Sequence, residues 1–354
     1  MQLGRLSGGR RRTCLWSNIH TKPTLRIRTD FGSLQSLAVV YRGHVHVTKA
    51  LPATVYSIKH GDCVLGMKML DAQSVDVVVT SPPYNIGIAY NSYKDNLEHE
   101  EYLAWCNQWG AEIRRTLKSD GSFFLNVGAT SGNPLFPFEV ANAMRRSGLA
   151  LQNIIHWIKS ISIEREDGTK SYGHFKPINS GRFLNDCQEY VFHFTPEGKT
   201  PLDRLGVGVP YADKSNVARW SHTNGRDKRC RGNTWFIPYE TITQRAKDRP
   251  HPATFPTDLA VKCIRLHGRK NAVVMDPFLG IGHSALAAGA CSDLVSKFIG
   301  FDIDEEYLKV CCALVGTTYS SVNPPARRPS HDRGTVQVRT ERSLKNRPEA
   351  LLVS

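Results

Sequence analysis

The sequence Val273-Val274-Met275-Asp276-Pro277-Phe278-Leu279-Gly280-Ile281-Gly282 decides the fold. Its β-branched start predicts a buried strand, and its two glycines predict a tight turn that leads into a helix over residues 284–289. A second predicted strand, residues 297–301, ends in Asp302, about twenty residues after the glycines. Strand, glycine turn, helix, strand and acid in this order are typical of the nucleotide-binding half of a doubly wound α/β fold.

The glycine turn admits two classes of cofactor. It satisfies the dinucleotide fingerprint in its G-x-G-x-x-A form, with Asp302 as the distal acid, so a nicotinamide-dependent oxidoreductase is one interpretation. Asp276, however, places a carboxylate where a pyrophosphate requires neutral or positive surroundings. That carboxylate would suit an amino group instead. S-adenosylmethionine carries an amino group and a ribose but no phosphate, so we expect it as the cofactor.

Strands and helices alternate through most of residues 54–316, which predicts a mostly parallel sheet. Ser119-Asp120-Gly121 predicts a turn, and residues 159–186 are interpreted as a long polar loop. The remaining predicted strands are 55–58, 75–79, 122–127, 151–158 and 189–194, and the remaining predicted helices are 63–70, 100–117, 137–147, 259–267 and 305–314.

A second stretch, Thr80-Ser81-Pro82-Pro83-Tyr84-Asn85, follows the predicted buried strand 75–79. Each proline fixes its own φ and lacks an N–H, so the loop is stiff and its carbonyls lack local donors. A stiff loop at a strand end that carries a hydroxyl, carbonyls and a tyrosine is a candidate active site. The alternative is a rigid turn without chemistry.

Composition narrows the class of protein. The chain has 354 residues, enough for one large α/β domain with an insertion. Its nine cysteines are scattered and form no C-x-x-C pair, so we expect no disulfide framework, no metal site and a reducing, cytoplasmic location. No run of about eighteen apolar residues occurs, so we expect no membrane span.

The net charge of +14 is unevenly distributed. Residues 199–249 hold eleven Lys and Arg against five acids, and this local excess suits a phosphate backbone. The same segment lacks regular periodicity, as functional segments of this length often do. Residues 1–50 and 317–354 are also basic, and we expect both to be flexible. The Arg-rich, acid-poor N-terminus fits an organellar transit peptide, a DNA-contacting tail or a misassigned start equally well.

Together, S-P-P-Y at Ser81–Tyr84 and D-P-F-x-G-x-G at Asp276–Gly282 resemble the amino-methylating DNA methyltransferases over about residues 54–316. The order of catalytic loop, basic segment and cofactor half is similar to the circularly permuted β group, and most like its cytosine-N4-specific members. The resemblance implies a seven-stranded sheet. It also implies a catalytic half, a target recognition segment for DNA and a cofactor half, at residues 51–195, 196–250 and 251–316.

The resemblance assigns cofactor-binding roles residue by residue. It implies that Asp276 faces the methionine part of S-adenosylmethionine, that Asp302 binds the ribose and that Asp62 lies near the adenine. Phe255 matches the family's helix-start motif, whereas His283 stands where the family usually has threonine. The other implied cofactor contacts are Phe278, Gly280 and Gly282.

The implied mechanism follows from the chemistry of an exocyclic amine, whose lone pair is delocalised into the base. The resemblance implies that Ser81 Oγ and the Pro82 carbonyl accept its N–H groups, and that Tyr84 stacks on a base flipped from duplex DNA. Methyl transfer then depends on positioning, without a covalent enzyme intermediate. No Pro-Cys pair occurs, which argues against carbon-5 cytosine methylation. The implied catalytic residues are Ser81, Pro82, Pro83 and Tyr84.

Serine at the first motif position goes mainly with cytosine N4 in the family, and aspartate with adenine N6. We therefore expect cytosine N4, with adenine N6 as the alternative. The expected partner is duplex DNA, and a cognate restriction endonuclease stays an open partner. An inert DNA-binding protein and a methyltransferase acting on RNA or protein are further alternatives. The expected phosphate contacts are Arg226, Lys228, Arg229 and Arg231.

Overall fold

The chain divides into two compact units, Met1–Ala50 and Leu51–Ser354. In the first, β1 (Ala38–Tyr41) and β2 (His44–Val47) form an antiparallel pair, so this part of the predicted flexible extension has regular structure. The Arg-rich start of that extension and most of the predicted C-terminal tail lie outside the described residues. The computed structural model describes residues 38–41, 44–47, 53–175, 178–238 and 254–322.

The second unit is built on one sheet, and its architecture is the predicted doubly wound α/β class. The strands are β3 (Val55–His60), β4 (Val75–Thr80), β5 (Leu117–Val127), β6 (Ala150–Ile158), β9 (Gln188–Thr195), β10 (Thr234–Phe236), β11 (Ala272–Asp276), β12 (Val295–Asp302) and β13 (Tyr319–Ser321). They stand in the order β10-β6-β9-β5-β4-β11-β12-β3-β13. The described sheet thus has nine strands rather than the seven expected, because the three-residue strands β10 and β13 extend its two edges.

Most neighbouring strands of the sheet run parallel, as predicted. The exception is β9, which is antiparallel to both β5 and β6. Parallel strands covered on both faces are expected to be apolar throughout, and every residue of β4 is buried. Because β9 runs the opposite way, it begins at the edge where β5 ends. Its first residues therefore reach the carboxyl edge of the parallel strands.

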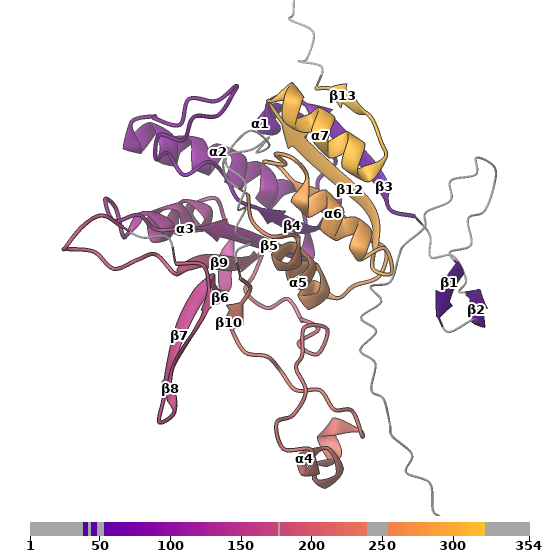
Figure 1. Cartoon of the computed structure of the whole chain (residues 1–354). Helices are drawn as coiled ribbons and strands as arrows, with labels where there is room; N and C mark the ends of the chain where they lie inside the picture. The colour runs from indigo at the N-terminus through magenta and orange to yellow at the C-terminus, as the bar shows by residue number, and fades with distance from the viewer. Residues whose placement is uncertain (1–37, 42–43, 48–52, 176–177, 239–253, 323–354) are drawn as a thin grey trace, which may run out of the picture. The chain divides into compact units, whose positions relative to one another are not determined.

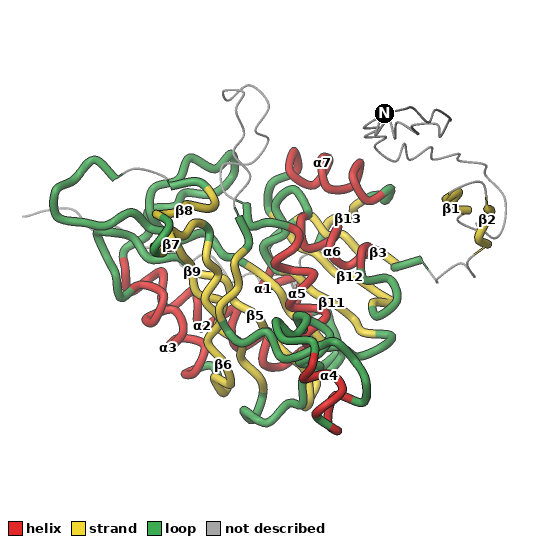
Figure 2. The backbone as a smooth tube through the Cα atoms, turned by 60° about the horizontal axis from the view of Figure 1, so that its bottom comes forward, coloured by secondary structure: helices red, strands yellow, loops and turns green. Residues whose placement is uncertain are grey.

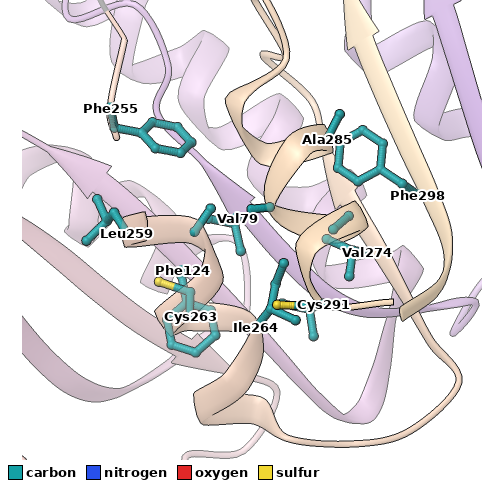
Figure 3. Close-up of a cluster of buried hydrophobic side chains, with 14 of the residues drawn as sticks. Val79, Phe124, Phe255, Leu259, Cys263, Ile264, Val274, Ala285, Cys291 and Phe298 are labelled. Carbon is teal, nitrogen blue, oxygen red and sulfur yellow. The ribbon is translucent and has the colours of Figure 1, made fainter. Parts of the chain in front are cut away.

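Helices cover both faces of the sheet, which gives three layers (Figures 1 and 2). One face carries α1 (Cys63–Lys68), α2 (His99–Thr116) and α3 (Phe136–Arg146). The other carries α5 (Thr257–His267), α6 (His283–Ala290) and α7 (Glu305–Val315). On this second face, Val79 and Phe124 of the sheet pack with Leu259 and Ile264 of α5, and the small side chain of Ala285 lets α6 approach closely (Figure 3).

Three local predictions are wrong. The predicted loop 159–186 contains a hairpin, β7 (Ser160–Arg165) with β8 (Gly168–Gly173), whose residues are almost all exposed, so no core pattern marks them. The predicted turn at residues 119–121 lies inside β5, beside an irregularity in its pairing with β4. The predicted tail includes β13, which pairs with β3.

The predicted recognition segment is largely irregular, as expected. Between residues 199 and 238 it holds α4 (Ser215–Arg219), the 3-10 helix η1 (Ser221–Thr223) and β10. Its end is nevertheless tied to the sheet, because Trp235 is 1 % exposed and Trp157 Nε1 donates to the Ile237 carbonyl at 2.8 Å. Residues 239–253 lie outside the described part. No described helix is long and apolar enough to cross a membrane.

Candidate active site

The two motif loops lie together at the carboxyl edge of the sheet. Because β4 pairs in parallel with β11, residues 81–84 and 277–282 leave the sheet on the same side. They border a cavity of about 840 Å³. Its lining includes the predicted catalytic residues Ser81, Pro82, Pro83 and Tyr84, and the predicted cofactor residues Asp62, Phe255, Phe278, Gly280, Gly282 and Asp302.

Contacts from α2 and from the following segment fix the catalytic loop. The Tyr102 hydroxyl of α2 donates to the Pro83 carbonyl at 2.6 Å. Asn85 adopts a left-handed φ of 57°, and its side-chain amide exchanges two hydrogen bonds of 2.7 Å with the Leu97 backbone. The loop that carries Ser81 is therefore held at Pro83 and at Asn85, which favours a preorganised site.

A buried carboxylate organises the segment after the loop. Asp95 is 3 % exposed, and it accepts three backbone N–H groups at 2.7 to 3.1 Å, from Asn85, Ile86 and Ile88. These bonds offset the cost of burying the charge. This wall of the cavity was not predicted, because no sequence motif marks Asp95. The segment's cavity-lining residues are Ile86, Ile88, Tyr90, Ser92 and Tyr93.

Asp276 lies beneath the cavity floor rather than in its lining. Its carboxylate accepts the hydroxyls of Thr80 and Ser284, each at 2.5 Å, and the Phe278 N–H at 3.0 Å. Burial raises the pKa of Asp276 to about 6, although the three hydrogen bonds act in the opposite direction. Asp276 thus joins the end of β4 to the start of α6. Asp276 is not among the residues that line the cavity, and its contact with the cofactor stays a prediction.

Asp302 ends β12 at the cavity and supports the glycine turn. Its carboxylate accepts the Gly280 N–H at 2.7 Å and the Asp304 N–H at 2.8 Å, and burial raises its pKa to about 6. Gly282 has a φ of 93°, and a Cβ there would lie 2.4 Å from Cys311 Sγ. Only glycine fits this turn, which explains the second glycine of the motif.

Two further predicted cofactor residues are held by local contacts. Asp62 accepts the Leu65 N–H at 2.8 Å and so caps α1 at the cavity. Phe278 packs edge-on against Trp105 and Trp109, with ring centroids 5.3 and 5.5 Å apart. These contacts give the cavity a rigid aromatic wall beside a carboxylate.

His283, the departure from the family motif, has a visible structural role. Its Nδ1 lies 2.6 Å from the Phe255 carbonyl oxygen, and both residues line the cavity. The bond connects the first residue of α6 to the segment that enters α5. A histidine here therefore fits the motif position without closing the cavity.

A polar cluster of Ser81, Tyr84, Asn126, Lys159 and Glu189 lines another part of the cavity. The Tyr84 hydroxyl lies 3.0 Å from both Ser81 Oγ and Glu189 Oε2. Asn126 Nδ2 donates to Glu189 Oε2 at 2.7 Å, and Lys159 Nζ donates to Glu189 Oε1 at 3.0 Å. Burial first, and Glu189 second, raise the pKa of Tyr84 well above its ordinary value.

Asn126, Lys159 and Glu189 were not predicted as site residues. A signal was available for each of them, since all three stand at the ends of predicted strands. Asn126 is near the end of β5, Lys159 follows β6, and Glu189 is near the start of β9. The missing information was the antiparallel direction of β9, which no local pattern reveals.

The predicted phosphate-contacting residues lie apart from the cavity lining. Arg226, Lys228 and Arg229 are exposed. Arg231 differs from these three, because it is half-buried and its Nε donates to the Val207 carbonyl at 3.0 Å. Arg231 thus supports the backbone of its own segment. Arg229 Nη1 also donates to the Cys230 carbonyl, at 3.3 Å, but it is exposed like Arg226 and Lys228.

Comparison with known proteins places this arrangement in a family. The family model described as DNA methylase matches residues 75–312. The type II methyltransferase M.ScaI from Streptomyces caespitosus is 29 % identical over 286 residues, which cover 75 % of this chain and 84 % of that protein. The DNA adenine methyltransferase YhdJ from Escherichia coli K12 is 26 % identical over 261 residues, which cover 72 % of this chain and 80 % of that protein.

Solved structures share the fold. PvuII DNA methyltransferase, described as cytosine-N4-specific, superposes with a TM-score of 0.51 at 18 % identity, over 77 % of this chain and 96 % of that chain. A DNA modification methylase from Thermus thermophilus, solved with S-adenosyl-L-methionine, gives 0.50 at 20 % identity, over 75 % and 98 %. The match at residues 75–312 spans both motif loops and the basic segment between them. The chain therefore belongs to the DNA methylase family, in the permuted β group of its amino-methyltransferases.

Proposed function

We propose that this enzyme transfers a methyl group from S-adenosylmethionine to the exocyclic N4 amine of a cytosine flipped out of duplex DNA. The observation that carries the proposal is the position of Ser81 in one cavity with the glycine turn and Asp302. A hydroxyl acceptor and a cofactor pocket in one cavity are what amine methylation requires.

S-adenosylmethionine is the cofactor, and the chemistry of the cavity suits it. Its adenine would contact aromatic walls such as Phe278, and its ribose hydroxyls would meet Asp302. Among the described lining residues, the only ammonium or guanidinium group is that of Lys159, which is bonded to Glu189. A ligand without phosphate fits these surroundings better than a dinucleotide. When bound, the cofactor supplies a methyl group activated by a sulfonium.

The catalytic loop would activate and orient the amine. Ser81 Oγ and the Pro82 carbonyl would accept its two N–H groups, which localises the nitrogen lone pair for attack on the methyl carbon. The Tyr84 ring, fixed through its hydroxyl, would offer a face on which the flipped base stacks. Tyr102 holds the loop from behind through the Pro83 carbonyl.

Duplex DNA would be held by the recognition segment. Its exposed Arg226, Lys228 and Arg229 suit phosphate contacts, since such contacts need charge presented to solvent. A cognate restriction endonuclease is a proposed partner, because M.ScaI is named as a type II methyltransferase. Such a partner would cut the same DNA site only before methylation.

Base identity is tested by incubating the enzyme with duplex DNA and isotope-labelled S-adenosylmethionine, then digesting the DNA for mass analysis. Ser81 supports N4-methylcytosine, which is the expected product. N6-methyladenine would overturn the choice of base, and the adenine-specific relative makes it the second candidate. Label found in RNA or protein, but not in duplex DNA, would overturn the substrate class.

A further inference from the structure

We infer that Glu189 is a positioning residue that turns a lone pair of Ser81 toward the substrate amine, and that it acts through the Tyr84 hydroxyl. The inference rests on the proposed function, because it assumes that Ser81 accepts an amine N–H. It adds a residue that lies more than one hundred positions from the catalytic loop and outside both motifs.

Strand topology brings Glu189 to the loop. Because β9 runs antiparallel to β5, Val127 at the end of β5 pairs with Tyr190 at the start of β9. Glu189 precedes Tyr190, so its carboxylate enters the cavity beside the end of β4. There its Oε2 lies 3.0 Å from the Tyr84 hydroxyl, which in turn lies 3.0 Å from Ser81 Oγ.

The donors around the Glu189 carboxylate set the direction of the hydrogen bonds. A carboxylate accepts and does not donate, and this one is paired with the Lys159 ammonium at 3.0 Å. Its side chain is 16 % exposed. The Tyr84 hydroxyl has one proton, and a bond to a charged acceptor is stronger than a bond to a neutral hydroxyl. The proton of Tyr84 therefore points to Glu189.

The orientation of Asn126 supports this direction. Its Nδ2 donates to Glu189 Oε2 at 2.7 Å and to the Tyr84 oxygen at 3.0 Å, while its buried Oδ1 has no hydrogen-bond partner among the described residues. If the Asn126 amide were reversed, its Oδ1 would face Glu189 Oε2, and two acceptors would lie against each other. The carboxylate thus orients the neighbouring groups even at the cost of an unpaired oxygen.

The direction of the Tyr84 proton determines where the Ser81 proton points. With its own proton directed to Glu189, the Tyr84 oxygen is an acceptor, so the Ser81 hydroxyl donates to it. Asn126 Nδ2 also lies 3.4 Å from Ser81 Oγ, a longer contact than those it makes to Tyr84 and Glu189. One lone pair of Ser81 Oγ is then available to an amine N–H from the cavity. Without the carboxylate, the Tyr84 proton can turn toward Ser81 and occupy a lone pair that the amine needs.

The test is a double-mutant cycle of Glu189→Gln and Tyr84→Phe, with kcat and KM measured on duplex DNA and the cofactor Kd measured separately. Tyr84→Phe keeps the ring and removes only the hydroxyl. We expect Glu189→Gln to lower kcat about 10- to 100-fold, since misplacing a catalytic group costs rate on this scale. KM for DNA and the cofactor Kd should stay within a few-fold. In the Tyr84→Phe background, Glu189→Gln should have little further effect.

The matched control is Glu166→Gln, an exposed glutamate in the turn between β7 and β8 that lies outside the cavity lining. It should leave kcat unchanged. Glu189→Asp is a second way to weaken the same hydrogen bond, because the shorter side chain withdraws the carboxylate from the Tyr84 hydroxyl. It should also lose its effect in the Tyr84→Phe background, which keeps the inference falsifiable if Glu189→Gln does not fold. Independent, multiplying losses in the double variants, or a wild-type kcat for Glu189→Gln, would overturn the inference. A wild-type enzyme that methylates no DNA amine would instead overturn the proposed function.

Discussion

Ser81 is the side chain on which the proposed chemistry depends most directly. Ser81→Ala removes one acceptor for the amine without changing the glycine turn or Asp302. We expect kcat to fall about 100- to 1,000-fold, as for the loss of one hydrogen bond at a reacting group, while the cofactor Kd changes little. Single-turnover methylation and equilibrium cofactor titration measure the two effects.

The control for Ser81→Ala is Ser296→Ala, because Ser296 is a serine near the start of β12 that bonds only backbone carbonyls. It should keep the wild-type kcat and cofactor Kd. If Ser81→Ala weakened cofactor binding as strongly as it slowed turnover, Ser81 would have a structural role instead.

Asp276 makes the stability of the folded chain depend on pH. Burial raises its pKa to about 6, above the ordinary 3.8, so the folded state keeps this proton to a higher pH than the unfolded state does. Its contribution to the free energy of unfolding is therefore largest below about pH 4, decreases as pH rises to about 6, and is constant above. The pKa difference corresponds to about 3 kcal/mol.

Asp276→Asn removes this titration, because an amide does not ionise. We expect the difference in unfolding free energy, variant minus wild type, to increase by up to about 3 kcal/mol from pH 4 to pH 7, because only the wild type loses stability over this range. Urea denaturation at a series of pH values measures it. Curves that stay parallel across this range would show that Asp276 is not the titrating group.

At the scale of elements, the segment after the catalytic loop depends on one carboxylate. Asp95→Asn leaves one side-chain oxygen for the three N–H groups that Asp95 now accepts. Each N–H that loses its partner in this part-buried segment costs up to about 1–3 kcal/mol, so we expect residues 86–94 to open more often and turnover to fall. Limited proteolysis of this segment, compared with hydrogen exchange in β4, measures local opening against global unfolding.

A suitable control for Asp95→Asn is Asp71→Asn, since Asp71 is exposed in the connection before β4. It should leave the cleavage rate of residues 86–94 unchanged. An Asp95→Asn protein with wild-type cleavage and turnover would show that this wall is held by other contacts.

The elements also show what local sequence can predict. Both motif loops were predictable, since each follows a β-branched run and strand ends of a parallel sheet meet at one edge. The position of Asp276 beneath the floor was not predictable, because its partners Thr80 and Ser284 are set by the pairing of β4 with β11. Glu189 was missed for the same reason. Its role depends on the direction of β9, which is a long-range property of the sheet.

At the scale of the whole molecule, a hydrogen bond next to the cavity joins the two halves of the second unit. The Thr80 hydroxyl, one residue before Ser81, donates to Asp276, which precedes the glycine turn. The catalytic loop and the cofactor turn thus share one buried carboxylate. This places the proposed acceptor groups for the amine in a fixed relation to the glycine turn, although about two hundred residues separate them.

The proposed DNA contacts lie outside the cavity lining. Changing Arg226, Lys228 and Arg229 together to alanine should weaken binding of any duplex sequence and make log K less steeply dependent on log salt, by about 1 to 3 in slope. The physical reason is that binding through fewer phosphate contacts releases fewer counterions from the DNA. Fluorescence anisotropy of labelled duplex DNA between low and moderate salt gives the slope. Arg231 is kept, because it supports the Val207 carbonyl.

The matched control removes three exposed cations elsewhere, Lys68, Arg146 and Lys270, which precede β4, β6 and β11 at the amino edge of the sheet. It changes net charge by the same amount, so it separates local phosphate contacts from the general field of the protein. We expect this control to keep the wild-type slope. Equal slopes for both triple variants would show that DNA is bound by a different surface, and the recognition segment would then need another partner for its exposed charge.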